Sequence, residues 1–172
     1  PAGQQRLHQQ RVGGRGRIGV TFRLGELALL VQQLGEREPH QVRLGPGLHV
    51  LLPHGDGLRV FGSHSGSGTS LSCYVPHAAH ADSDGRIEPD FLWGTLDCPG
   101  AWAAQDPDDW RPALTGRMTA KVLHRPKVGE RCAVVGWRIG AEGRKLYSGT
   151  ALYTEQGLLC AIAHCTWIVL KS

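Results

Sequence analysis

The sequence predicts an α+β fold in which an antiparallel sheet packs against one helix. Two observations support this prediction. Residues 90–104, DFLWGTLDCPGAWAA, are a short segment of apolar and small residues, as expected of a helix that lies close to a sheet. The chain from residue 114 onward divides into four runs rich in β-branched and aromatic residues. A length of 172 residues is sufficient to bury a core.

The four runs are residues 114–125, 131–140, 144–154 and 158–170, and the sequences PKVGE, AEG and EQG separate them. These separators have the length and composition of hairpin turns, so we expect an antiparallel meander. In the last run, the odd-numbered residues from 159 to 169 share one face, which has small residues at its centre. That face suits a covering helix. Residues 57–62 and 69–75 predict a further hairpin.

The helix itself has an irregular sequence. Pro89 suits the first helical turn, whereas Pro99 cannot donate a backbone hydrogen bond to the Thr95 carbonyl. Two interpretations follow. The helix runs from about Pro89 with a kink at Pro99, or Asp97 caps a second segment that begins at Cys98.

The first fifty residues predict little. Residues 1–50 are expected to be a poorly defined segment and residues 51–172 the folded domain; within the former, 15–23 suggest a short strand and 25–35 a short helix. Residues 1–25 contain five arginines and no acid, in a chain of net charge +4. Such an arm could bind nucleic acid, but no aromatic residue alternates with the arginines to stack a base. A solvated tail is therefore favoured, and nucleic acid is an unlikely partner.

Several classes of protein are disfavoured. No apolar run is long enough for a membrane span, and the absence of a signal-peptide pattern predicts a cytoplasmic protein. The five cysteines are odd in number and widely spaced, which favours reduced thiols. We expect no cofactor and no metal. Cys160 and Cys165 are an odd number of residues apart on one predicted strand and should face opposite sides.

Asp97 is the acid set inside the apolar segment. A carboxylate there is costly unless it is paired, hydrogen-bonded or used, so Asp97 is the candidate catalytic residue, with helix capping as the alternative. Glu88 and Asp90 could be a second acid or substrate contacts, although acids are also common in a first helical turn. Cys98 is a poor candidate nucleophile because the adjacent carboxylate raises the pKa of its thiol.

The run FLWGTLDCPGAWA, followed by LTGRMTAKVLHRPKVGE, VVGWRIG, GRKLYSGTALY and AHCTWI, resembles the hotdog-fold thioesterases of the phenylacetate-pathway (PaaI-like) type. The resemblance covers about residues 56–170. It implies a hotdog fold, with an antiparallel sheet wrapped around one central helix, and hydrolysis of an acyl–coenzyme A thioester. It also implies a homodimer or homotetramer whose helices lie back to back and whose site forms between subunits.

In that family a helix aspartate acts on the attacking water, and Asp97 matches it by position. A His-Gly-Gly run precedes the family's helix, whereas Glu88, Pro89 and Asp90 stand near its place here. The predicted function is therefore an acyl-CoA thioesterase. The alternative is a non-catalytic acyl-thioester-binding or assembly module of the same fold.

The remaining candidates are substrate contacts. Phe91, Leu92 and Trp93 are expected to border an acyl pocket. The phosphates of coenzyme A need cations, which two sets of residues could supply. The first set flanks the AEG turn, and the second shares one face of its strand with Thr115 and Thr119; a solvated polar face explains both sets equally well. These sets are Arg138, Arg144 and Lys145, and Arg117 and Lys121.

Overall fold

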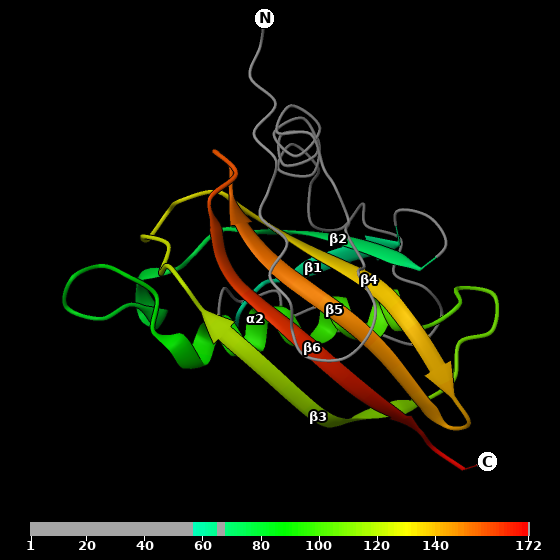
Figure 1. Cartoon of the computed structure of the whole chain (residues 1–172). Helices are drawn as coiled ribbons and strands as arrows, with labels where there is room; N and C mark the ends of the chain where they lie inside the picture. Colours follow the sequence, from blue (N-terminus) through cyan, green and yellow to red (C-terminus); the bar gives the residue numbers. More distant parts are fainter. Residues whose placement is uncertain (1–56, 65–67, 172) are drawn as a thin grey trace, which may run out of the picture.

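Six antiparallel strands form one sheet, and one long helix lies across a single face of it in the computed structural model, which describes residues 57–64 and 68–171 (Figure 1). The predictions for residues 1–50 lie outside the described residues. No helix in the described part is long and apolar enough to cross a membrane. The elements are β1 (Phe61–His64), β2 (Thr69–Tyr74), the 3₁₀ turn η2 (Ala78–His80), α2 (Pro89–Ala104), β3 (Ala113–Val122), β4 (Cys132–Glu142), β5 (Lys145–Thr154) and β6 (Leu159–Val169).

The strand order is β1-β2-β4-β5-β6-β3. The predicted strands and the β1–β2, β4–β5 and β5–β6 hairpins are confirmed. The predicted meander is wrong for β3, which pairs with β6 while β2 occupies the place beside β4. The segment containing PKVGE is therefore a crossover and not a hairpin turn. Backbone hydrogen bonds fix its course, because the amides of Leu123 and His124 both donate to the Cys160 carbonyl, at 2.8 and 3.0 Å.

Helix α2 is continuous, so the prediction of one helix that begins at Pro89 is confirmed, and the interpretation in which Asp97 caps a second helix is wrong. The kink expected at Pro99 stays a prediction. Glu88 has an extended backbone and precedes Pro89, whose fixed φ suits the first turn. Pro99 lies inside the helix. Its carbonyl accepts an additional hydrogen bond at 2.6 Å from the buried Ser70 hydroxyl, which ties the helix to β2.

Glycines allow α2 to approach the sheet closely. A Cβ atom at Gly136 on β4 would overlap the Ser70 hydroxyl and the Pro99 carbonyl, and one at Gly100 would lie 3.0 Å from Ser148 Oγ. Beside this contact, Leu92 and Leu96 are fully buried in the main core. Burial of each of these side chains contributes about 1.5–3 kcal/mol. The helix position is thus fixed by close packing.

The predicted alternation of β6 is confirmed for residues 161–169, whose odd-numbered members are buried and whose even-numbered members are partly exposed. It fails at the start of the strand, where Leu152 pairs with Ala161 and Tyr153 pairs with Leu159. Cys160 is therefore the extra residue of a β-bulge. The prediction that Cys160 and Cys165 face opposite sides is wrong, because both thiols lie in the buried core.

Candidate active site

Asp97 lies in the middle of α2, half-buried, and faces strand β3 at the edge of the sheet. Its Oδ1 atom accepts a hydrogen bond of 3.1 Å from the hydroxyl of Thr115, which is exposed. Oδ2 has no hydrogen-bond partner among the described residues. One carboxylate oxygen is thus held by the protein and the other remains available to a ligand or to water.

A β-bulge aims Thr115 at the helix. The β3–β6 register pairs Thr115 with Trp167 but Arg117 with Thr166, so Gly116 is the extra residue. Trp167 is buried on the helix side of the sheet, and its cross-strand neighbour Thr115 shares that side. The prediction that Thr115 shares a face with Arg117 and Lys121 is therefore wrong. The sequence analysis missed the role of Thr115, although a glycine inside a strand pattern is a signal of a bulge.

Two thiols lie close to the Asp97 carboxylate. Burial, with a further effect from the charge of Asp97, raises the pKa of the Cys165 thiol to about 12. Burial and the same charge also raise the pKa of the Cys98 thiol. Both cysteines therefore carry neutral thiols near pH 7, which agrees with the prediction that Cys98 is a poor nucleophile.

The other predicted residues of α2 lie along its first two turns. Glu88 and Asp90 are exposed, and Trp93 has 40% of its surface exposed. Asp90, Trp93 and Asp97 are three and four residues apart, so they lie along one face of the helix. Phe91 is half-buried, and its ring stacks on that of His80 with 4.3 Å between centroids. Leu92 does not border a pocket as predicted, because it is fully buried against the sheet.

The three predicted phosphate contacts do not come together. Arg138 pairs across the sheet with Ser148, whose hydroxyl accepts a buried hydrogen bond from Trp167, and so lies on the helix side. Lys145 pairs with Ile168 and lies on the opposite side. Arg144 donates from Nη1 to the Val169 carbonyl at 3.0 Å. The cations around the AEG turn therefore point to different places.

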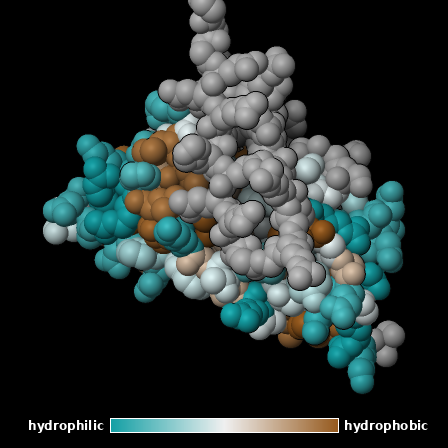
Figure 2. All heavy atoms as spheres, in the orientation of Figure 1, coloured by the Kyte–Doolittle hydropathy of each residue, from teal (hydrophilic) through white to brown (hydrophobic). Residues whose placement is uncertain are grey.

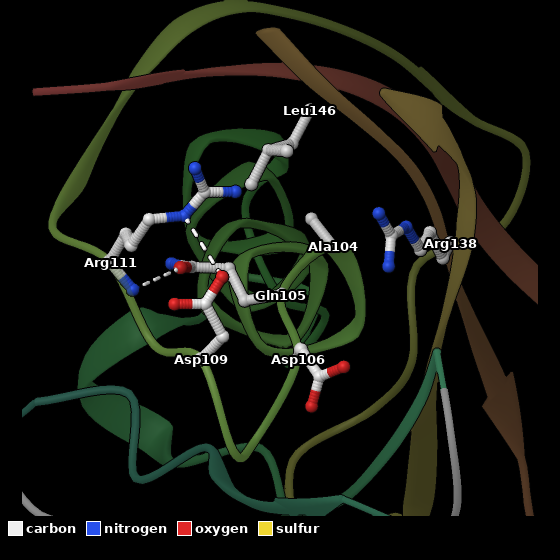
Figure 3. A pocket seen from close by; sticks show the side chains of 7 residues that line it. All are labelled: Ala104, Gln105, Asp106, Asp109, Arg111, Arg138 and Leu146. Carbon is white, nitrogen blue, oxygen red and sulfur yellow. Dashed lines mark hydrogen bonds and ion pairs between the residues drawn. The ribbon is translucent and has the colours of Figure 1, made fainter. Parts of the chain in front are cut away.

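Arg138 does line a pocket of about 130 Å³ at the C-terminal end of α2 (Figure 3). In this pocket Arg111 forms an ion pair of 3.5 Å with Asp109, and its backbone amide donates to Gln105 Oε1 at 2.9 Å. The Arg138 side chain stands on the opposite wall. Asp97 is not among the lining residues, which are Ala104, Gln105, Asp106, Asp109, Arg111, Arg138 and Leu146.

Comparison with known proteins identifies the architecture. No protein-family profile and no curated protein matches the sequence. Solved structures do match. The PaaI protein of the Escherichia coli phenylacetic acid degradation operon has a TM-score of 0.61 and 11% identity, over 67% of this chain and 82% of its own. PaaI of Thermus thermophilus, solved as a mutant, has a TM-score of 0.58 and 20% identity, over 66% and 95%.

A third match, smu.793 of Streptococcus mutans bound to acetyl-CoA, has a TM-score of 0.61 and 12% identity, over 73% of this chain and 97% of its own. The chain has the hotdog fold. At these identities the likeness establishes the fold and does not establish the chemistry of the site.

In this hotdog domain Asp97 and Thr115 lie where the central helix meets the edge strand β3. The described residues contain no group of three or more His, Cys, Asp or Glu side chains that could hold a metal ion.

Proposed function

We propose that this chain is a thioesterase that hydrolyses an acyl–coenzyme A thioester with Asp97 as the catalytic residue. The observation that carries the proposal is the half-buried Asp97 carboxylate, with Oδ1 held by Thr115 and Oδ2 unoccupied by any described residue. The hotdog fold supports it, as does the acetyl-CoA bound to the Streptococcus mutans protein of the same fold. A positioned carboxylate suits this reaction, because a thioester is already activated and mainly needs an oriented water.

In the proposed reaction, Asp97 Oδ2 accepts a proton from a water molecule as the water oxygen attacks the thioester carbonyl carbon. The carbon–sulfur bond of the resulting tetrahedral intermediate then breaks, and the leaving coenzyme A thiolate takes up the proton that Asp97 had accepted, which regenerates the carboxylate. The products are a carboxylic acid and coenzyme A thiol. The Thr115 hydroxyl keeps the carboxylate in one orientation during this transfer. A base positioned in this way contributes roughly 10²- to 10⁴-fold to a rate.

The oxyanion that forms on the thioester requires hydrogen-bond donors. The first amides of a helix have no intrahelical partner, and in α2 these belong to Asp90 and Phe91. They precede Asp97 by six or seven residues, which places them about 10 Å away along the helix axis. One chain therefore does not bring its own helix start to its own Asp97, and we propose that a second copy supplies the donors.

The open edge of β3 supports this assembly. Among the described strands β3 pairs only with β6, so ten residues of edge strand are left without a neighbour on the other side. Long exposed edges pair readily with another strand. We propose a homodimer in which the β3 edges of two chains adjoin. Its mass in solution tests this, together with a fall in specific activity when the protein is diluted below the dissociation constant of the dimer.

The hydrolase proposal is tested by thiol release from a panel of acyl-CoA thioesters. Asp97→Asn is expected to lower kcat by roughly 10²-fold or more, and Thr115→Val by a smaller factor because it removes only the orienting hydrogen bond. Asp84→Asn is the matched control, since it removes an exposed carboxylate that lies outside α2. Equal activity of Asp97→Asn and the wild-type protein would refute the role of Asp97.

A second candidate function is a non-catalytic module that binds an acyl thioester. The observation that favours it is the pair of acids, Glu88 and Asp90, at the start of α2. Their negative charge opposes the stabilisation of an oxyanion by the helix amides. A module of this kind would be stabilised against thermal unfolding by acyl-CoA while releasing no thiol from it.

Separate variants test the remaining assignments, and each is expected to raise the KM for the thioester. The residues assigned to the acyl group are Phe91 and Trp93, and those assigned to phosphate are Arg138, Arg144 and Lys145.

A further inference from the structure

The outer face of the sheet, which points away from α2, carries an unpaired set of cations around an aromatic pair. We propose that this face binds single-stranded nucleic acid, with its phosphates on the cations and a base on the aromatic rings. We call it the basic face and define it by Arg117 and Lys121 on β3, Lys145 and Tyr147 on β5, and His164 on β6. This inference does not require the proposed hydrolysis, although Lys145 is also a candidate contact for the phosphates of coenzyme A.

The strand register places the three cations together on this face. The bulge at Gly116 turns the rest of β3 over, so that Arg117 pairs with Thr166 and Lys121 pairs with Ile162. Lys145 pairs with Ile168. These β6 partners are the even-numbered residues that face away from the helix, and all three cationic residues are exposed. Arg117 and Lys121 are about 13 Å apart along the strand.

The charge of the face is balanced only in part, at one end, where Glu142 of β4 pairs across the sheet with Lys145 and accepts the Tyr147 hydroxyl. Strands β3, β5 and β6 contain no aspartate or glutamate. In the described part of the chain, Arg117, Lys121 and Lys145 form no ion pair, whereas arginines elsewhere pair with acids. In Figure 2, drawn in the orientation of Figure 1, hydrophilic residues lie among hydrophobic ones on the visible part of this side of the molecule. Unpaired cations on an exposed strand attract a polyanion.

An aromatic pair lies among these cations. The rings of Tyr147 and His164 are nearly parallel, with 6.3 Å between centroids and an interplanar angle of 29°. Tyr147 pairs with Thr166, the same residue that pairs with Arg117, so its ring is about two strand spacings, or about 10 Å, from that cation. Its hydroxyl is held by Glu142 at 3.1 Å, which fixes the ring.

Cations beside a partly exposed aromatic ring are the combination that binds single strands without sequence preference. An acidic protein partner would be bound by the cations alone and would not require the aromatic rings. The sequence analysis disfavoured nucleic acid because the N-terminal arginines have no aromatic neighbour. The sheet places aromatic rings beside cations, which the N-terminal arm does not, because residues from three strands meet on this face. Single-stranded nucleic acid is therefore the occupant that the face fits best.

The test uses the full chain and a short fluorescein-labelled oligothymidylate, with binding followed by fluorescence anisotropy at several salt concentrations. The double variant Arg117→Ser, Lys121→Ser is expected to bind more weakly. It should also lower the slope of log K against log salt by about 1.4, because each phosphate contact to a single strand contributes about 0.7. Tyr147→Ala should weaken binding by roughly 5- to 150-fold and leave the slope unchanged.

The matched control is the double variant Arg59→Ser, Lys127→Ser, which removes the same charge from two other exposed positions. Arg59 follows Leu58, whose side chain lies against Gly94 of α2 on the opposite side of the sheet. The proposal is overturned if the wild-type chain does not bind the oligonucleotide, or if both double variants lose the same affinity. It is also overturned if polyglutamate competes equally well and Tyr147→Ala has no effect, since that result identifies an acidic protein partner.

Discussion

Replacement of Gly136 by alanine tests how the central helix is seated on the sheet. The added methyl group would overlap the Ser70 hydroxyl and would lie 2.5 Å from the Pro99 carbonyl and 3.1 Å from the Ala103 methyl group. Overpacking of this kind costs about 1–3 kcal/mol, and loss of the Ser70–Pro99 hydrogen bond adds about 0.5–1.5 kcal/mol. We therefore expect the free energy of unfolding to fall by about 1.5–4.5 kcal/mol.

Urea denaturation followed by tryptophan fluorescence measures this change as a lower midpoint at an unchanged m-value. Gly140→Ala is the control on the same strand, because a Cβ atom there has no neighbour within 4 Å. It should leave the stability unchanged or raise it by up to about 1 kcal/mol. If Gly136→Ala is as stable as the wild-type protein, the close contact of helix and sheet does not hold the helix in place.

The same substitution has a consequence for the site. Asp97 lies two residues before Pro99, so a displaced helix moves the carboxylate away from Thr115. If the proposed hydrolysis is correct, Gly136→Ala also lowers kcat, because small misplacements of a catalytic group are costly. Gly140→Ala keeps full activity. Comparison of the two variants thus separates helix position from general stability.

Three further results are expected. Asp97→Asn should speed the alkylation of Cys98 by iodoacetamide near pH 8, because removal of the carboxylate lowers the pKa of that thiol; an unchanged rate would contradict the electrostatic contact. Hydrogen bonds, first from the Arg86 amide and then from Arg125, lower the pKa of Asp82, so the stability lost in Asp82→Asn at pH 7 should shrink as the pH falls through that lowered value. A constant difference would refute this. Trp167→Phe leaves the buried Ser148 hydroxyl unpaired and should cost about 1–3 kcal/mol in urea unfolding.

The elements that the sequence predicted well are those with strong local signals. Strand β6 shows an apolar and polar alternation along most of its length, and the AEG and EQG turns are short enough to require hairpins. Pro89 marks the start of α2 because the fixed φ of proline favours the first turn of a helix. The position of Asp97 within α2 could be predicted because it lies inside an apolar segment; its catalytic role stays a prediction. These signals each depend on a few neighbouring residues.

The elements that were missed depend on distant contacts. The placement of β3 beside β6 depends on pairs such as Met118 with Cys165, which are more than forty residues apart in sequence. A bulge changes which side chains share a face, and this hid both the contact of Thr115 with Asp97 and the grouping of Arg117 with the outer face. The separation of Arg138 from Lys145 likewise depends on cross-strand register.

The position of β6 between β5 and β3 has a consequence for synthesis on the ribosome. Strand β3 leaves the ribosome well before its only described neighbour, so Thr115 has no fixed place until the C-terminal strand is inserted. A nascent chain that has folded every earlier element still lacks the partner of Asp97. The candidate catalytic pair therefore forms only after β6 has been synthesised and has paired with β3.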